Sequence, residues 1–249
     1  MSENLTIKSL KSRPSMKASL RDGMFTSVMA TCGEQYLTTF AIFLRASAVQ
    51  IGFISSIPPL IGSLSQIFGV WLLELLKNRR LIMVAGACLQ ALSLLPIAFV
   101  AFFLSDDPTS VWLVVAASAL YYFSVSSTQP SWNSLLGDLV PMSLKGEFFG
   151  LRNKLNGMIT VATLAISGIF LQLGTAAKLT AITFGVMFLV SCISRLCSAY
   201  WLYKHEEPTY KVKPESAFSF YQFLSRAHKS NFAKFVLFIG TMNFGVGIA

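Results

Sequence analysis

Residues 81–104 read LIMVAGACLQALSLLPIAFVAFFL and contain no charged side chain. A helix rises ~1.5 Å per residue, so about 20 apolar residues are enough to cross the ~30 Å hydrocarbon core of a bilayer. Three basic residues, Lys77, Arg79 and Arg80, stand directly before this run. The stretch therefore predicts a membrane-spanning helix with a positively charged end.

Five further segments have the length and apolar character of a membrane span: residues 24–43, 49–75, 111–135, 150–173 and 179–203. The chain is 54% hydrophobic and only 12% charged, whereas soluble domains contain about 25% charged residues. This composition excludes a disordered chain and an ordinary cytosolic enzyme. Most connections between the segments are a few residues long, which makes consecutive helices antiparallel neighbours. We predict an all-α membrane protein with a six-transmembrane-helix bundle over residues 23–203.

The distribution of Lys and Arg predicts how the bundle is oriented. Of the 20 basic residues, all but Arg45, Lys178 and Arg195 lie in the N-terminal tail (residues 1–22), near residues 77–80 and 145–154, or after residue 203. Because basic residues concentrate on the cytoplasmic side, these segments are expected in the cytoplasm, and the protein in the cell (inner) membrane. The net charge of +9 is explained by this topology, so we expect no nucleic-acid partner.

Two segments follow the predicted bundle. Residues 204–232 are polar, and their second half mixes aromatic with basic residues, which is typical of a helix on the membrane surface but equally of an ordinary tether. Residues 233–249 begin a new apolar run. From Phe235 to Ala249 this run would reach only about 22 Å as a helix. We therefore expect an incomplete seventh transmembrane helix, and a chain that is a fragment, or the product of an interrupted gene, of a longer transporter-like protein.

Three of the predicted helices carry polar residues at steps of three or four, which places each set on one helix face. The sets are Ser27, Thr31, Glu34 and Thr38; Tyr122, Ser126, Gln129 and Asn133; and Asn156, Thr160, Thr163 and Ser167. In a membrane such faces either enclose an aqueous cavity or hold helices together. The first and fourth helices lead two three-helix halves of opposite orientation, and corresponding positions of inverted repeats are where binding sites form.

Glu34 lies near the middle of the first predicted span. An ionisable group at that depth costs roughly 2.5–3.5 kcal/mol on insertion scales, and desolvation favours its protonated form. Two interpretations stay open: a proton-coupling or substrate-cation site, or a neutral structural side chain paired with Arg195 or Gln129. Arg195 has two interpretations as well, because it either snorkels to the interface or serves as an intramembrane partner for Glu34 or for a substrate carboxylate.

Catalytic and cofactor motifs are absent from the sequence. The four cysteines all lie in predicted spans without C-x-x-C or metal spacing, so we interpret them as packing residues and expect no metal site. The two histidines, His205 and His228, lie in the predicted linker, which argues against an intramembrane protease and against b-type haem. No Walker loop is present. We expect no enzyme, no catalytic residues and no cofactor.

A family resemblance is carried by residues 132–153, WNSLLGDLVPMSLKGEFFGLRN, with an acid at Asp138, a proline at Pro141 and a basic residue before Gly146. This pattern resembles the helix 4–5 junction of bacterial major facilitator superfamily transporters. Residues 22–25, 46–52 and 243–249 are similar to the start of the first helix, the helix 1–2 turn and the opening of helix 7 in that superfamily. The resemblance covers nearly the whole chain and implies the N-terminal six-helix half of a two-bundle fold, without its second half.

The superfamily's helix 2–3 signature combines a glycine, an acid and a basic end. Residues 69–80 keep Gly69 and the basic end, with Glu74 one place late and Asn78 in place of the second glycine. The resemblance implies a cytoplasmic gate of charged pairs that holds the inner side closed in one conformer; solvated loop charges are the alternative interpretation. Its members would be Glu74, Arg79, Arg80, Asp138 and Arg152.

Together these features predict a secondary active transporter that works by alternating access and is coupled to an ion, with a proton as the expected ion and Glu34 as its carrier. The expected partners are the lipid bilayer, a small-molecule substrate of unknown identity, and a missing C-terminal half or a second copy. The alternative is a truncated or degenerate membrane protein that transports nothing. The residues expected to line the substrate cavity are Gln35, Thr38, Gln129, Trp132, Asn133 and Asn156.

Overall fold

The computed structural model describes residues 14–107, 109–206, 234–235 and 238–242. The chain divides into two units, residues 1–210 and 211–249. In the described part of the first unit, the chain is helical and contains no strand. Its elements are α2 (Pro14–Cys32), the 3₁₀ turn η1 (Glu34–Tyr36), α3 (Leu37–Phe43), α4 (Ala48–Leu76), α5 (Arg79–Phe103), α6 (Ser110–Leu139), the 3₁₀ turn η2 (Met142–Leu144), α7 (Lys145–Ala176) and α8 (Thr180–Tyr203).

Five of these helices, α4 to α8, are long and apolar enough to cross a membrane. They coincide with five of the predicted spans, and the ends differ by at most a few residues. Local signals define several of these ends. Ser47 and Gln50 form a reciprocal capping box at the start of α4, and the side chain of Asn78 accepts a hydrogen bond from the backbone of Leu81 at the start of α5. The predicted class, an all-α membrane protein, is confirmed.

The first predicted span differs from the expectation in two ways. Its helix, α2, begins at Pro14 instead of residue 24. Small side chains explain the early start: Ser15, Ala18 and Ser19 are buried on one face, whereas Lys17 is exposed on another. Spacings of three and four residues place the buried side chains together, so the charged residues of this segment do not keep it out of the bundle.

The first span is also interrupted, so the predicted continuous helix over residues 24–43 is wrong. The α-helix ends at Cys32, and Glu34–Tyr36 form a 3₁₀ turn before α3 begins. Gly33 packs closely against α8 here, since an added Cβ would lie 2.9 Å from Oγ of Ser191 and 3.1 Å from the carbonyl oxygen of Met29. The break divides the predicted polar face of this span, and it places Glu34 in a turn rather than inside a helix.

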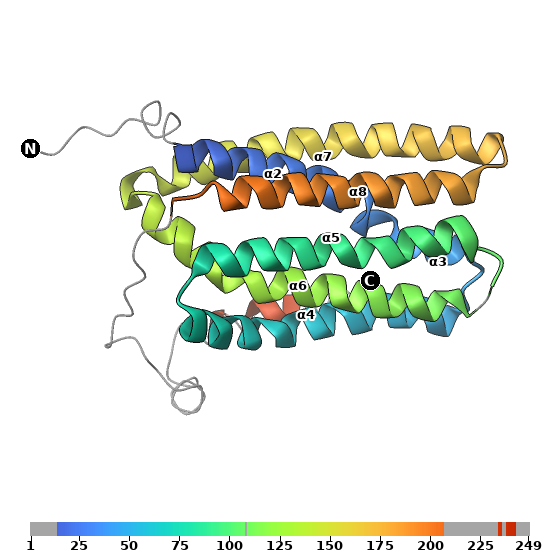
Figure 1. The fold of residues 1–249 in the computed structure, drawn as a ribbon, viewed down its shortest axis with the longest axis horizontal. Helices are drawn as coiled ribbons and strands as arrows, with labels where there is room; N and C mark the ends of the chain where they lie inside the picture. The colour runs from blue at the N-terminus through green and yellow to red at the C-terminus, as the bar shows by residue number, and fades with distance from the viewer. Residues whose placement is uncertain (1–13, 108, 207–233, 236–237, 243–249) are drawn as a thin grey trace, which may run out of the picture. The chain divides into compact units, whose positions relative to one another are not determined.

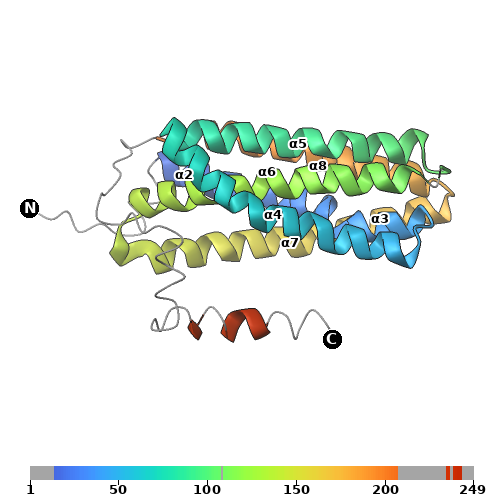
Figure 2. The same ribbon diagram turned by 90° about the horizontal axis from the view of Figure 1, so that it is seen from below.

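The helices are arranged in two groups of three (Figure 1). In one group α6 packs between α4 and α5, and in the other α2 packs between α7 and α8, while α5 and α8 join the groups (Figure 2). The first span therefore has the same kind of neighbours as the fourth span. The two groups are not the two predicted halves of the chain, since the first span packs with the fifth and sixth and the fourth span packs with the second and third.

Close helix contact in the first group depends on Gly69. A Cβ at this position would overlap the carbonyl oxygen of Ser127 and would lie 2.8 Å from its carbonyl carbon. A separate aromatic contact joins α3 to α8. The ring centroid of Phe40 lies 5.1 Å from that of Phe184 and 5.2 Å from that of Phe188.

In the second unit, the described residues, Lys234, Phe235 and residues 238–242, are helical. Most of the predicted seventh helix and nearly all of the predicted linker lie outside the described residues. Both stay predictions.

Candidate functional site

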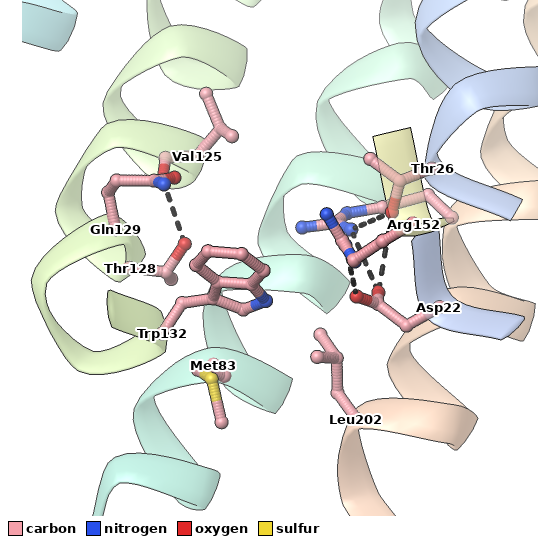
Figure 3. Close-up of a pocket in the computed structure, with 10 residues that line it drawn as sticks. Asp22, Thr26, Met83, Val125, Thr128, Gln129, Trp132, Arg152 and Leu202 are labelled. Carbon is pink, nitrogen blue, oxygen red and sulfur yellow. Dashed lines mark hydrogen bonds and ion pairs between the residues drawn. The ribbon is translucent and has the colours of Figure 1, made fainter. Parts of the chain in front are cut away.

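A polar cavity of about 180 Å³ lies between five helices (Figure 3). Along α8 it lies toward the C-terminal end of the helix, where Arg195 and Leu202 line it, and along α2 it lies near the middle, at Asp22 and Thr26. The residues that line it are Asp22, Thr26, Met83, Val125, Thr128, Gln129, Trp132, Arg152, Arg195 and Leu202. The first, fourth and fifth spans thus contribute to a common cavity, together with α5 and α8.

Asp22 is the acid of this cavity, and it is only 2% exposed. Its carboxylate accepts hydrogen bonds from Oγ of Ser198 at 2.7 Å and from Oγ1 of Thr26 at 3.3 Å. Two guanidinium groups face it, with Nη2 of Arg152 at 3.3 Å and Nη1 of Arg195 at 4.0 Å. The carboxylate is therefore held by groups from α2, α7 and α8.

The two arginines are anchored differently. Arg195 is 5% exposed, and its Nη1 donates to Thr26 at 3.0 Å and to Ser198 at 2.8 Å. Its Nε has no hydrogen-bond partner among the described residues. Arg152 donates from Nε to the carbonyl oxygen of Ser19 at 3.3 Å and lies over the ring of Trp132, 4.8 Å from its centroid. Two guanidinium groups against one carboxylate leave one net positive charge, which attracts anions in a medium of low dielectric constant.

Two of the predicted roles of Arg195, snorkelling and pairing with Glu34, are corrected by this geometry, whereas its role as a partner for a substrate carboxylate stays a prediction. The side chain does not snorkel to the interface, because it is buried in the bundle, and its acidic partner is Asp22 rather than Glu34. Sequence reasoning missed Asp22 because residues 1–22 were interpreted as a tail. A signal was present, since Asp22 follows buried Ser15, Ala18 and Ser19 at helical spacing.

Glu34 lies outside this cavity and is bound by two tyrosines of α6. Oη of Tyr121 donates to Oε2 at 2.8 Å, and Oη of Tyr122 donates to Oε1 at 2.9 Å. Among the described residues Glu34 forms no ion pair. The predicted pairing with Arg195 or Gln129 is therefore wrong. The tyrosines precede Val125 of the cavity wall by about one helical turn.

The other predicted cavity residues divide into three groups. Gln129 and Trp132 line the cavity. Asn156 lies beside it and packs against Gly23, where an added Cβ would be 2.7 Å from Oδ1. The remaining three are exposed and do not line this cavity: Gln35, Thr38 and Asn133.

The predicted gate residues are only partly brought together. Nη1 of the buried Arg79 lies 2.6 Å from Oδ2 of Asp138 and 3.2 Å from Oγ of Ser134. Arg80 lies over the ring of Tyr203 at 5.4 Å. Glu74 is exposed and forms no ion pair with a described residue. Arg152 binds Asp22 in the cavity, so its predicted contact with the gate is wrong.

Apolar helices of membrane-spanning length around a charged cavity define a multi-pass membrane protein of the transporter class. The chain matches the family described as Major Facilitator Superfamily over residues 19–249, and it belongs to that family of transporters. Comparison with curated proteins gave no match, and comparison with solved structures gave none either.

Proposed function

We propose that this chain is a secondary active transporter that moves a small molecule bearing an anionic group by alternating access, and that a proton carried by Glu34 drives the movement. We place its N-terminus in the cytoplasm and the bundle in the inner membrane, as the basic residues predict. A second six-helix bundle, either a C-terminal half or a second copy, would complete the pathway.

The observation that carries the proposal is the contrast between the two acids of the interrupted first span. Asp22 faces two guanidinium groups, with which it forms ion pairs. Glu34 is bound by tyrosine hydroxyls alone among the described residues, so it can take up a proton without breaking an ion pair. Binding sites of secondary transporters often involve interrupted helices at such positions.

The cavity around Asp22 supports the anionic substrate class. Its net positive charge attracts anions. The Nε of Arg195, which has no hydrogen-bond partner among the described residues, can donate to a carboxylate or phosphate group. The volume of about 180 Å³ is smaller than the ~300–1,000 Å³ of complete ligand pockets. A second bundle would supply the remaining wall.

The test uses the full-length gene product in sealed vesicles that contain a pH-sensitive dye. Succinate, citrate and inorganic phosphate are offered as anionic substrates, and choline and glucose as cationic and neutral comparisons. We expect an anion gradient to move protons, and Glu34→Gln to abolish this proton movement while anion exchange continues. Glu147→Gln, which changes an exposed acid of α7 that forms no ion pair with a described residue, is the matched control. Unchanged proton movement in Glu34→Gln would contradict the role of Glu34, and the absence of flux for every compound would favour a non-transporting protein.

A further inference from the structure

A second cluster of charge lies on the outer side of the α2–α8 pair, away from Asp22. Lys17 and Arg21 project from α2, and Lys204 follows the end of α8. The guanidinium carbon of Arg21 lies 4.3 Å from the ring centroid of Trp201, and Nζ of Lys204 lies 5.8 Å from the same ring. All three cations are exposed, and none forms an ion pair with a described residue.

These cations surround a hollow of about 290 Å³ at the start of α2, whose lining is completed by Pro14, Ala18 and Trp201. Three positive charges in a hollow whose lining contains no acid are suited to an anion. The hollow differs from the substrate cavity in its walls, since the two have no lining residue in common.

An apolar groove of about 360 Å³ continues from this hollow. It is lined by Arg21, Met24, Phe25, Val28, Ile159 and Trp201, so it shares Arg21 and Trp201 with the cationic hollow. From Pro14 to Val28 the two features follow α2 for about 21 Å. A site for a soluble anion would not need the apolar groove, and an ordinary lipid-facing surface would not carry three cations at one end.

We propose that this paired feature binds one anionic phospholipid of the membrane. The phosphate contacts Lys17, Arg21 and Lys204, and an acyl chain lies along Met24, Phe25 and Val28. Trp201 lies between the two parts, where an amphipathic ring is favoured at a membrane interface. The basic end lies on the side predicted to be cytoplasmic, where basic pockets between helices recognise anionic headgroups. This inference requires only that the bundle is in a membrane, and it does not depend on transport.

The test measures which lipid contacts Trp201. Trp71, Trp112 and Trp132 are replaced by Phe so that Trp201 is the remaining tryptophan, and the protein is placed in bilayers that contain a small fraction of a brominated lipid, which quenches nearby tryptophan. We expect brominated phosphatidylglycerol in a phosphatidylcholine bilayer to quench the fluorescence of Trp201 far more than its bulk fraction predicts. Brominated phosphatidylcholine in a phosphatidylglycerol bilayer should quench no more than its bulk fraction predicts. Each cation near an anionic headgroup contributes about fivefold in affinity, so Lys17→Gln, Arg21→Gln and Lys204→Gln each lower the preference by that factor.

Lys154→Gln is the matched control, because Lys154 is an exposed base of α7 outside both the cationic hollow and the apolar groove. The preference of this variant for phosphatidylglycerol should be unchanged. Equal quenching by the two lipids overturns the proposal, as does an unchanged preference in all three hollow variants. The wild-type protein gives a second measurement if the single-tryptophan variant does not fold. Phosphatidylglycerol added to the protein in detergent should raise its melting temperature, and inorganic phosphate should not. Equal stabilisation by phosphate alone would indicate a site for a free anion and would overturn the lipid proposal.

Discussion

Replacing Asp22 by Asn removes the negative charge of the buried cluster while it keeps the size of the side chain. The carboxylate then no longer faces Nη2 of Arg152, at 3.3 Å, or Nη1 of Arg195, at 4.0 Å. The hydrogen bond from Ser198, at 2.7 Å, is weakened as well, since a neutral amide oxygen accepts less strongly than a carboxylate. Two guanidinium groups are left in the bundle without a counter-charge.

The magnitude follows from the burial of the partners. Removing one member of a buried ion pair costs about 3–5 kcal/mol, because the other charge stays buried without compensation. Arg152 keeps the carbonyl oxygen of Ser19 and the ring of Trp132, and Arg195 keeps the hydroxyl groups of Thr26 and Ser198, so the expected loss lies at the lower end of this range. We therefore expect Asp22→Asn to lower the free energy of unfolding by about 3 kcal/mol.

The measurement is reversible unfolding in mixed detergent micelles, followed by circular dichroism. Arg195→Gln and the double variant complete a cycle, and the double variant should recover about 1–3 kcal/mol relative to the sum of the single changes, since it leaves only Arg152, and not two guanidinium groups, without the carboxylate. Asp106→Asn, in an exposed loop, is the matched control and should stay within about 0.5 kcal/mol of the wild type. Additive single changes, or a loss for Asp22→Asn no larger than that of the control, would refute the ion cluster.

Two further predictions concern packing and pH. Gly69→Ala should lower the free energy of unfolding by about 1–3 kcal/mol, because its methyl group would overlap the backbone of α6. Gly52→Ala, on the same helix with nothing within 4 Å, should raise it by about 0.5–1 kcal/mol, and equal effects would contradict the α4–α6 contact. Burial lowers the pKa of His205 from its ordinary value of 6.5, and the charge of Arg152 lowers it further. Asp22 and the carbonyl oxygens of Trp201 and Leu202 partly oppose this lowering. The stability contributed by neutral His205 is therefore present above about pH 6.5 and is lost as pH falls through the lowered value. His205→Gln should have a melting temperature that falls less on acidification than that of the wild type.

The sequence was most informative where one physical requirement dominates. The spans α4 to α8 follow from apolar length and from the basic residues beside them, because a lipid-exposed backbone has to satisfy its own hydrogen bonds. The start of α2 was predicted too late because Lys17, Arg21 and Asp22 make the segment polar on average. Burial there depends on which face of the helix each residue occupies and on partners in α7 and α8.

The site was less predictable because its contacts join distant parts of the chain. Gln129, which helical spacing placed on a polar face, and Trp132 both line a cavity, and its role as a substrate cavity stays a prediction. The pairing of Asp22 with Arg195 depends on α2 lying against α8, which no local pattern specifies. The contacts of the predicted gate also depend on how distant helices pack, and there Arg79 contacts Asp138 whereas Arg152 contacts Asp22.

The cluster around Asp22 also bears on what Glu34 can do. Among the described residues, no guanidinium group forms an ion pair with Glu34. Arg195 is instead committed to Asp22, Thr26 and Ser198 on the other side of the break at Gly33. Tyrosine hydroxyls can donate to a carboxylate and can also accept from a carboxylic acid, so Glu34 keeps hydrogen-bond partners in both protonation states. One acid of the interrupted span therefore pairs with guanidinium groups and the other with tyrosine hydroxyls, and the proposed proton coupling rests on this difference.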